Sequence, residues 1–410
     1  MAKSMLVVVL VVALLALEAS ASFNSTADLP RDCASTRLYR VKNRQDPVRG
    51  ANLGSWLIQE AWMVGWLWNQ GGCDSNQYPG AYLLEQCLGG NAYTIISKHW
   101  ATFVQESDFA QMAQNNLNTV RLPVGWWQIY DPQGGASKAH LKQYVSPTNY
   151  LVGGLHYIDQ AFAWGAKYGI SILLDIHAAP GSQSGNQDTA PPDNTGNIYW
   201  DKYAANPAQT ADSIELYVQR YANEPALLGF CLLNEPGHQT QSGNINIDTV
   251  QAYYQDAYNR IRQYTSSAWV VINPLISPFQ YGTEPEWTSF MNPDQGYTNV
   301  FMSIHYYHCF GGMPSGDNNV INYAHYQRQQ QIAQYYQVNP KPMLIDEWSA
   351  CGVSPGRYGD MIQAQVAGFG QAAGWVFWAW SQTWGGDPWS FKTAFQNGWI
   401  NPSQTGVASC

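Results

Sequence analysis

Eight short apolar runs recur along the chain and alternate with longer amphipathic stretches. The runs are apolar throughout rather than at every second residue, which is typical of strands buried on both faces of a sheet. In the intervening stretches, apolar residues recur at three- and four-residue steps, as in Ile158, Phe162 and Ala166, which predicts helices. Repeated strand-then-helix units predict an α/β protein with a parallel sheet. Eight units predict a single (β/α)8 (TIM) barrel with extended βα loops.

No linker, repeat or low-complexity tract divides residues 22–410, so we expect them to form one domain. The strands are predicted at residues 48–57, 119–124, 170–176, 227–233, 269–272, 300–304, 342–345 and 375–379. The helices are predicted at residues 107–116, 150–168, 210–221, 249–264, 320–338 and 357–373.

Reactive or aromatic side chains lie at or near the ends of most predicted strands. In (β/α)8 barrels the functional groups gather at the carboxyl ends of the strands and in the loops that follow. The loop at residues 178–207 is long for such a barrel and is predicted to form a wall of a cleft. The side chains at the strand ends are Arg121, His177, Asn234, Glu235, His305, Tyr307, Glu347 and Trp378.

Two glutamates among these residues, Glu235 and Glu347, each follow an apolar run after one polar residue. A pair of carboxyl groups facing each other is what glycoside hydrolysis requires, because one protonates the leaving oxygen and the other attacks or stabilises the sugar. Glu224 lies in the same Asn-Glu-Pro tripeptide as Glu235, but it closes a helical stretch, so we prefer Glu235. Asp346 competes with Glu347, and strand alternation predicts that Asp346 points to the opposite face.

The composition limits the possible partners. The net charge is −9, only 12% of residues are charged and no basic run is present, which argues against a nucleic acid or an anionic membrane as partner. Aromatic residues reach 14%, with 18 Trp and 26 Tyr, and suggest a surface on which flat ligands stack. His305 and His308 lack a third ligand at a suitable spacing, so no metal is expected. Nothing indicates obligate assembly, and we expect a monomer.

The amino-terminal residues 1–21 are predicted to be a secretory signal peptide. They contain Lys3, an apolar run at residues 6–17 and small residues suited to cleavage. The apolar run is too short to span a membrane. We therefore expect a secreted protein, extracellular or in a cell wall, and Asn24 is the candidate glycosylation site.

The chain has seven cysteines, an odd number that leaves at least one thiol unpaired in a secreted protein. Cys231 lies within an apolar run and is the predicted buried free thiol. Cys73 and Cys87 flank one loop and are the simplest pair to propose. Cys410 is expected to fix the carboxyl terminus, with Cys309 as its suggested partner.

Seven ordered motifs together resemble the family 5 glycoside hydrolases, and within them the fungal exo-1,3-β-glucanases. Each motif is weak alone, but they occur in the family's order and span nearly all of residues 22–410. They are residues 49–57 (RGANLGSWL), 120–125 (VRLPVG), 175–183 (DIHAAPGSQ), 233–236 (LNEP), 305–307 (HYY), 347–350 (EWSA) and 374–380 (GWVFWAW).

The resemblance implies a retaining mechanism with Glu235 as the acid/base and Glu347 as the nucleophile. A cation near Glu347 is expected to keep it ionised, and a neighbouring negative charge with partial burial is expected to keep the proton on Glu235 near neutral pH. The resemblance assigns the remaining site residues to sugar binding or to support of the nucleophile: Glu60, Arg121, His177, Asn234, His305, Tyr307 and Trp378.

One departure from the family concerns the second sugar. The fungal members place an aromatic residue and then an acid where this chain has Asn186 and Gln187. One half of an aromatic clamp is therefore missing, while Phe310, the other half, is present. This departure affects the expected affinity for the leaving sugar and leaves both catalytic acids in place.

These observations predict a secreted catalytic domain that cleaves 1,3-β-glucan and releases glucose from non-reducing ends, with a polysaccharide or oligosaccharide as partner. Two carboxyl groups and water complete the reaction, so no cofactor is expected. Three alternatives stay open. They are an endo-acting or exo-acting relative on 1,6-β-glucan, 1,4-β-glucan or mannan, a transglycosylase, and a non-catalytic glucan-binding protein. The last class would lack one of the two acids, and both are present.

Overall fold

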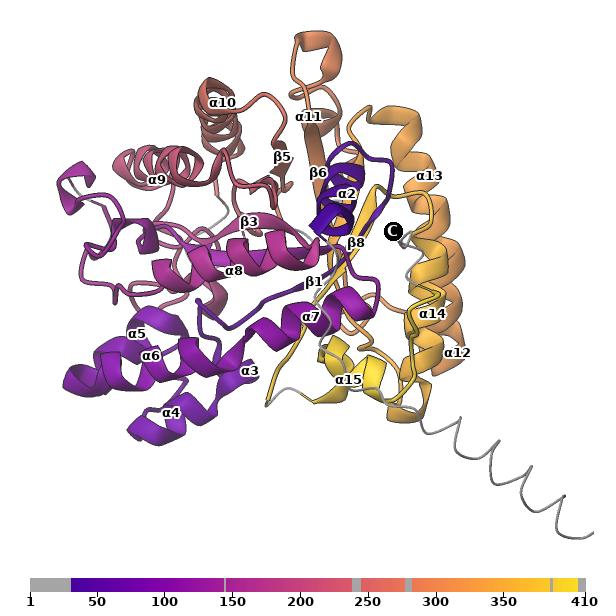
Figure 1. Ribbon diagram of the computed structural model, residues 1–410, viewed down its shortest axis with the longest axis horizontal. Helices are drawn as coiled ribbons and strands as arrows, with labels where there is room; N and C mark the ends of the chain where they lie inside the picture. The colour runs from indigo at the N-terminus through magenta and orange to yellow at the C-terminus, as the bar shows by residue number, and fades with distance from the viewer. Residues whose placement is uncertain (1–30, 144, 238–244, 277–281, 384–385, 405–410) are drawn as a thin grey trace, which may run out of the picture.

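Eight parallel strands form a closed barrel in chain order, and β1 pairs with β8 to close it (Figure 1). The computed structural model describes residues 31–404 apart from 144, 238–244, 277–281 and 384–385. All eight predicted strands are confirmed, with ends that differ by a few residues. They are β1 (Val48–Asn52), β2 (Thr119–Gly125), β3 (Ser171–Ala178), β4 (Leu227–Cys231), β5 (Trp269–Ile272), β6 (Val300–Tyr306), β7 (Met343–Trp348) and β8 (Gly374–Phe377).

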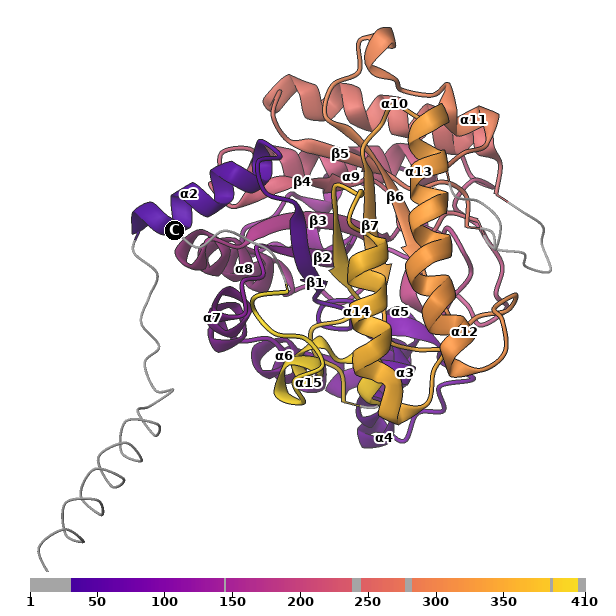
Figure 2. The same cartoon turned by 90° about the vertical axis from the view of Figure 1, so that its right-hand side faces the viewer.

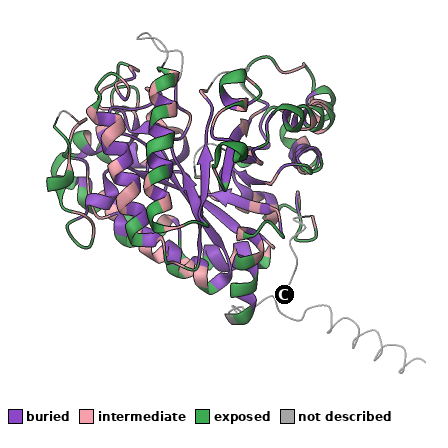
Figure 3. Ribbon diagram, turned by 90° about the horizontal axis from the view of Figure 1, so that it is seen from above, coloured by how far each residue is buried: buried purple, intermediate pink, exposed green. Residues whose placement is uncertain are grey.

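Helices surround the barrel, with buried faces toward the strands and exposed faces toward solvent (Figures 2 and 3). The helix predicted at residues 320–338 is instead divided, because a π-helical turn at Tyr323–Gln327 separates α12 from α13. The α-helices are α2 (Arg31–Lys42), α3 (Ala61–Val64), α4 (Trp66–Gly71), α5 (Gly80–Leu88), α6 (Ala92–Phe103), α7 (Glu106–Gln114), α8 (Leu155–Tyr168), α9 (Ala205–Tyr221), α10 (Ile247–Tyr264), α11 (Pro285–Thr288), α12 (Asp317–Asn322), α13 (Arg328–Val338), α14 (Tyr358–Gly368) and α15 (Phe391–Gln396).

The barrel strands carry an apolar cluster as well as buried charges. Val41 of α2 packs with this cluster, and the Trp269 indole donates to the carbonyl of Lys42 at 3.1 Å, which fixes α2 against the barrel. Side chains from seven of the eight strands make up the rest of the cluster: Val48, Leu173, Leu228, Cys231, Trp269, Val271, Phe301, Leu344 and Val376. The buried charges Arg121, Asp175 and Asp346 also lie on the strands. The barrel therefore combines a packed apolar region with a polar region that serves the site.

Two disulfides have both of their cysteines among the described residues. The predicted bond between Cys73 and Cys87 is confirmed, with sulfurs 2.05 Å apart. The suggested pairing of Cys309 with Cys410 is wrong, because Cys309 bonds Cys351. Both of these residues come shortly after neighbouring parallel strands, β6 and β7, which brings their Cα atoms to 5.3 Å.

The prediction that Cys231 is a buried free thiol is also confirmed. Cys410, the predicted signal peptide at residues 1–21 and the candidate glycosylation site Asn24 lie outside the described residues. Within the described part of the chain, no helix is both long and apolar enough to cross a membrane.

Candidate active site

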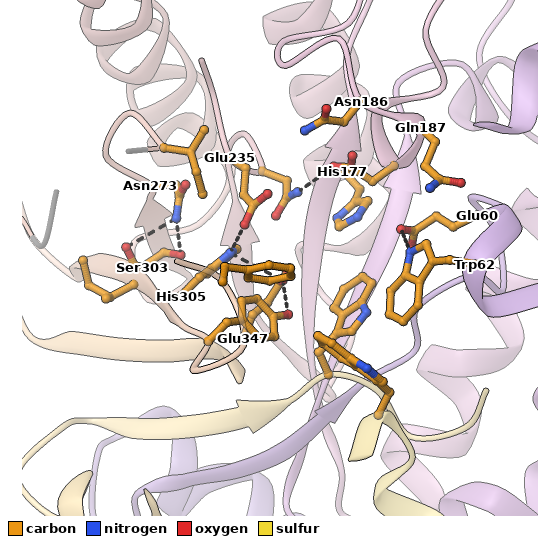
Figure 4. A pocket seen from close by; sticks show the side chains of 18 of the residues that line it. Glu60, Trp62, His177, Asn186, Gln187, Glu235, Asn273, Ser303, His305 and Glu347 are labelled. Atoms are coloured by element: carbon orange, nitrogen blue, oxygen red, sulfur yellow. Dashed lines mark hydrogen bonds and ion pairs between the residues drawn. The ribbon is translucent and has the colours of Figure 1, made fainter. Parts of the chain in front are cut away.

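A cavity of about 1410 Å³ opens at the carboxyl ends of the strands (Figure 4). It is lined by side chains from strand ends and from the loops that follow, as expected for the functional face of a barrel. Arg121 does not line it and lies within the barrel, 1% exposed. The other predicted site residues all line it: Glu60, His177, Asn234, Glu235, His305, Tyr307, Phe310, Glu347 and Trp378.

The carboxyl groups of Glu235 and Glu347 face each other across this cavity (Figure 4). One oxygen of each lies within 4.8 Å of the other. Glu347 belongs to β7, whereas Glu235 follows β4 and adopts a φ of 41°. A non-glycine residue in this left-handed region is uncommon and marks a backbone that the surrounding structure holds in place. The two acids, 112 positions apart in the chain, therefore meet in one pocket.

Arg121 organises the base of the site. Its guanidinium donates to Oε1 of Glu347 at 2.8 Å and to Oδ1 of Asn234 at 2.7 Å. It also pairs with Asp175 at 3.1 Å and with Asp346 at 3.4 Å. Burial lowers the pKa of Arg121, but the charges of these acids outweigh it and raise the pKa well above its ordinary value. A fixed positive charge therefore lies directly beside Glu347.

Asp346 does not point away from the site, and the alternation prediction is wrong for this residue. Asp346 is fully buried, contacts Arg121 and accepts from the hydroxyl of Ser303 at 2.5 Å. The pairing of β6 with β7 shifts register between Ser303 and His305, where β7 gains one residue. This irregularity breaks strict alternation and lets consecutive acids both face inward.

His305 and Tyr307, on and just after β6, connect the two acids. Nδ1 of His305 lies 2.6 Å from Oε1 of Glu235 and 3.4 Å from Oε2 of Glu347. The hydroxyl of Tyr307 donates to Oε2 of Glu347 at 2.7 Å. Burial lowers the pKa of His305, but the charge of Glu347 and the bond to Glu235 outweigh burial and raise the pKa to about 9. This shift favours the protonated imidazolium form of His305 at neutral pH.

The pKa shifts of the two acids oppose the expectation from sequence. Burial raises the pKa of Glu235, but the hydrogen bond and charge of His305 outweigh burial and lower it below its ordinary value. Burial raises the pKa of Glu347, and the charges of His305 and Arg121 only partly offset this. The expectation omitted His305, which shares with Glu235 the proton that was assigned to Glu235 alone.

Another wall of the cavity carries Glu60, His177 and Trp378. The His177 ring stacks on the Trp378 ring at 5.3 Å, and its Nδ1 lies 2.7 Å from Asp175. Trp378 reaches this position because Gly54 leaves room for it, since a Cβ there would lie 2.8 Å from the indole. The Trp62 indole donates to Oε2 of Glu60 at 2.8 Å.

Two segments that follow β1 and β3 meet beside this wall. Oε1 of Gln187 accepts from the backbone nitrogen of Ala61 at 2.8 Å, and the Asn194 amide donates to the carbonyl of Gln77 at 3.3 Å. Gly80 lies so close that a Cβ there would be 2.4 Å from the Gln187 carbonyl. We call these contacts between residues 61–80 and 187–194 the loop bridge. Both segments line the cavity, so the loop bridge forms its wall at that end.

The side where the leaving sugar would lie carries aromatic rings. Phe310 is 61% exposed and lies 5.6 Å from the Tyr307 ring and 6.5 Å from the Trp389 ring. Trp389 also packs against Trp62 at 5.0 Å. Asn186 is exposed and lines the same cavity.

Comparison with known proteins identifies the family. A model of the cellulase family (glycosyl hydrolase family 5) matches residues 87–383. The chain belongs to glycosyl hydrolase family 5. It is 29% identical over 398 residues to a probable glucan 1,3-beta-glucosidase A of Emericella nidulans, across 86% of this chain and 89% of the relative. It is 26% identical over 419 residues to a glucan 1,3-beta-glucosidase of Blumeria graminis, across 88% and 90%.

The crystal structure of a rutinosidase from Aspergillus niger shares the fold of this family 5 chain. The TM-score is 0.69, with 18% identity across 87% of this chain and 99% of that chain. Membership of family 5 makes the protein an O-glycoside hydrolase.

Within this family 5 site, one trio of described residues could offer ligands to a metal. Glu235, His305 and Glu347 place one ligand atom each within 4.8 Å of the others. Glu235 and His305 already contact each other, and Glu347 accepts from Arg121 and Tyr307. The trio is part of a hydrogen-bonded network that also includes Arg121 and Tyr307.

Sequence reasoning missed several residues of the family 5 site. Asp188 lines the cavity next to Asn234, and Trp62 and Trp389 line it as well. Gln183 is fully buried and donates to the carbonyls of His177 at 2.7 Å and Asn234 at 2.9 Å. Its place in the DIHAAPGSQ motif was a signal that could have identified it.

Proposed function

We propose that the protein is a secreted retaining hydrolase that removes glucose from the non-reducing ends of 1,3-β-glucan. The single observation that carries the mechanism is the separation of Glu235 and Glu347, with oxygens within 4.8 Å. Retaining enzymes hold their carboxyl groups about 5–5.5 Å apart, whereas inverting enzymes need about 6.5–9.5 Å to admit a water. The close separation favours direct attack by one carboxylate.

Glu347 is the proposed nucleophile. Arg121 and Tyr307 each donate to one of its oxygens, which fixes the carboxylate and compensates its negative charge. In the first step an oxygen of Glu347 bonds to the anomeric carbon while the glycosidic bond breaks. Glu235 transfers its proton to the departing oxygen, so the leaving glucan ends as an alcohol and the sugar remains as an ester of Glu347.

Water completes the reaction. Glu235, now a carboxylate, takes a proton from a water molecule whose oxygen bonds to the anomeric carbon and displaces Glu347. The configuration at the anomeric carbon inverts in each of the two steps, so the product keeps the β configuration. The proton that Glu235 donates is supplied through the 2.6 Å contact with His305.

The remaining residues are proposed to bind the sugar. The amide oxygen of Asn234 accepts from Arg121, which directs its amide nitrogen away from Arg121 and toward the 2-hydroxyl. His177 and Glu60 offer polar atoms to other hydroxyl groups, and Trp378 provides an apolar surface beneath the ring. Phe310 is the proposed platform for the next sugar.

The loop bridge supports release from chain ends. A cleft that crosses a barrel from side to side admits the middle of a polymer, but residues 61–80 and 187–194 meet and wall off one end. The 1,3 linkage is proposed from the names of the two fungal relatives, each aligned over most of its length. Secretion is proposed from residues 1–21, and the two disulfides support an oxidising compartment.

The experiment that tests this function compares laminarin, pustulan and carboxymethylcellulose as substrates of the purified protein. We expect hydrolysis of laminarin with glucose as the early product, and proton NMR should show the β anomer first. A ladder of oligosaccharides would contradict action at chain ends. Preferential hydrolysis of either other polymer would contradict the 1,3 linkage, and transfer products would indicate a transglycosylase.

Two variants show whether the activity belongs to this site. Glu347→Gln should abolish turnover on every substrate, because no ester can form. Glu235→Gln should reduce hydrolysis of laminarin by about 10²–10⁴-fold while sparing cleavage of aryl glycosides with good leaving groups, which need no proton. Equal losses on both kinds of substrate would overturn these roles.

A further inference from the structure

Asp346 is fully buried beside the two catalytic glutamates, and the proposed mechanism gives it no step. Its carboxylate oxygens have different neighbours. Oδ1 lies 3.5 Å from Nε2 of His305 and accepts from the Ser303 hydroxyl at 2.5 Å. Oδ2 lies 3.4 Å from Nε of Arg121. One buried acid therefore contacts the two cationic side chains that lie beside the catalytic acids.

These contacts connect β5, β6 and β7 to the acid/base (Figure 4). The Asn273 amide, which follows β5, donates to the Ser303 hydroxyl at 2.6 Å, and that hydroxyl donates to Asp346. On the other side of Asp346 is His305, whose Nδ1 lies 2.6 Å from Glu235. The buried Nε2 of His305 has no hydrogen-bond partner among the described residues, so the ion pair with Asp346 compensates it. His305 thus has a carboxylate beside each ring nitrogen.

We propose that Asp346 is a positioning residue, which holds the His305 ring between the catalytic acids and favours the protonated form that supplies Glu235. The proposal rests on the proposed function and names the residue that controls the proton donor of that reaction. With Nε2 directed at Asp346, the ring directs Nδ1 at Glu235. A negative charge within about 4–6 Å also favours the protonated ring. Burial lowers the pKa of His305, but Glu347, Glu235 and Asp346 raise it to about 9.

The proton moves along one contact of this arrangement. Nδ1 of His305 passes its proton to Oε1 of Glu235 across 2.6 Å, and the ring becomes neutral. Glu235 then gives a proton to the departing glycosidic oxygen. In the second step, water returns a proton to Glu235, and Glu235 passes it back to Nδ1, so the protein gains and loses no proton over the cycle. Asp346 exchanges no proton and acts on the ring by contact and by charge.

Asp175 on β3 offers a matched comparison for Asp346. It is equally buried and pairs with the same Arg121 guanidinium at 3.1 Å, but its other oxygen lies 2.7 Å from Nδ1 of His177. The two aspartates therefore share a cation and differ in the histidine that they contact. The titratable and charged groups around Asp346 and His305 are Arg121 of β2, Asp175 and His177 of β3, Cys231 of β4, Glu235 after β4, Tyr307 after β6 and Glu347 of β7.

The test measures kcat/KM for an aryl β-glucoside across the pH range in Asp346→Asn and Asp175→Asn. Asparagine keeps the size of either side chain and removes its charge. Asp346→Asn should move the alkaline limb to lower pH by about 1–3 units, because the imidazolium loses an adjacent negative charge. Asp175→Asn should also lower kcat, but it should move this limb less, because Asp175 contacts His177. Equal movements would show that Asp346 acts only through Arg121, and an unmoved limb in Asp346→Asn would likewise overturn the proposal.

Two further measurements separate this role from damage to the fold and from the proposed function. In a His305→Gln background, Asp346→Asn should move the limb no further, and a further movement would contradict a role through His305. NMR of protein labelled with ¹⁵N-histidine follows the titration of His305, whose signal is assigned by its loss in His305→Gln. The pKa of His305 should fall by about 1–3 units in Asp346→Asn, and an unchanged pKa would overturn the proposal.

The NMR measurement requires no turnover. An unaltered protein that cleaves no β-glucoside would therefore refute the proposed function, while the titration would still decide whether Asp346 controls His305. If Asp346→Asn does not fold, Asp346→Ser undergoes the same comparisons.

Discussion

At the scale of single residues, the site depends on where one proton resides. Glu235 and Glu347 lie too close for both to be ionised without compensation, and Arg121 supplies only one fixed positive charge. His305 supplies the second through its contacts with both acids. The proton for the leaving group is therefore shared between His305 and Glu235, and its loss is a property of the pair rather than of either residue.

The pH profile of kcat/KM should reveal this sharing. The pKa of His305 is raised to about 9, so the alkaline limb of the wild-type profile should lie in that range. In His305→Gln the proton resides on Glu235 alone, and the alkaline limb should move to lower pH. The measurement is hydrolysis of an aryl β-glucoside across the pH range, with exposed His140→Gln as control. An unchanged limb would show that Glu235 holds its proton without His305.

Site residues could be predicted from the sequence where their place on a strand determines which way their side chains point. Glu235 and Glu347 follow apolar runs, so the barrel brings them to one rim. Asp346 was assigned to the wrong face because the register shift between β6 and β7 leaves no trace in the pattern of apolar residues. Asp188 was missed because it lies in a three-residue 3₁₀ helix (Gln187–Thr189) within a long loop, which is too short for a periodicity to tell which side chain enters the cavity.

At the scale of elements, the loop bridge depends on the close approach of α5 to the segment after β3. Gly80 begins α5 with a φ of 76°, and a Cβ there would meet the carbonyl oxygen of Gln187 at 2.4 Å and Cδ of Pro191 at 3.1 Å. Gly89 follows the same helix with a φ of 53°, but a Cβ there would meet nothing within 4 Å. An alanine at either position would be strained by the positive φ. Only at position 80 would its methyl group also collide with neighbouring atoms.

Substitution of each glycine by alanine separates these effects. Gly89→Ala should cost about 1–3 kcal/mol of unfolding free energy from backbone strain alone. Gly80→Ala should cost about 1–3 kcal/mol more, because the methyl group displaces Gln187. Only Gly80→Ala should raise KM for an aryl glucoside, since Asp188 adjoins Gln187. Urea unfolding and steady-state kinetics measure both quantities, and equal effects of the two substitutions would show that the contact does not matter.

Helices and strands could be predicted where the local pattern of apolar residues determines them. Continuous apolar runs located every strand, but β1 was predicted to reach residue 57 and ends at Asn52. The chain turns there, with Ser55 at a φ of 57°. The Cys309–Cys351 bond depends on which loops are neighbours across the barrel, and spacing in sequence does not reveal this. The single helix predicted over residues 320–338 likewise did not anticipate the π-helical turn at Tyr323–Gln327.

At the scale of the whole molecule, buried acids make stability depend on pH. Glu85 is buried in α5 and accepts from the backbone nitrogen of Leu151 at 2.8 Å. Burial raises the pKa of Glu85 to about 8, from 4.5 in an ordinary carboxyl group. Below pH 4.5 both the folded and unfolded states hold the proton. Between pH 4.5 and 8 only the folded state holds it, so the free energy of unfolding falls as pH rises.

Glu85→Gln should remove this dependence, because the amide keeps the acceptor for Leu151 and cannot ionise. Relative to the unaltered protein, the variant should gain about 1 kcal/mol of unfolding free energy per pH unit from pH 5 to 7. Urea unfolding at several pH values measures the gain, and Glu286→Gln, at an exposed position, is the control. A constant difference at all pH values would mean that Glu85 ionises within the folded protein.

The loop bridge forms a wall at one end of the cavity. On the proposed pathway, this wall limits the order in which the two products can leave. On the proposed pathway the detached glucose lies between this wall and the shortened polymer, so we expect it to leave through the side that the polymer occupied. The polymer must leave before water can reach the ester and before the monosaccharide can escape. We therefore expect each encounter to remove one unit, so that the enzyme acts distributively and changes chains between cleavages instead of advancing along one of them.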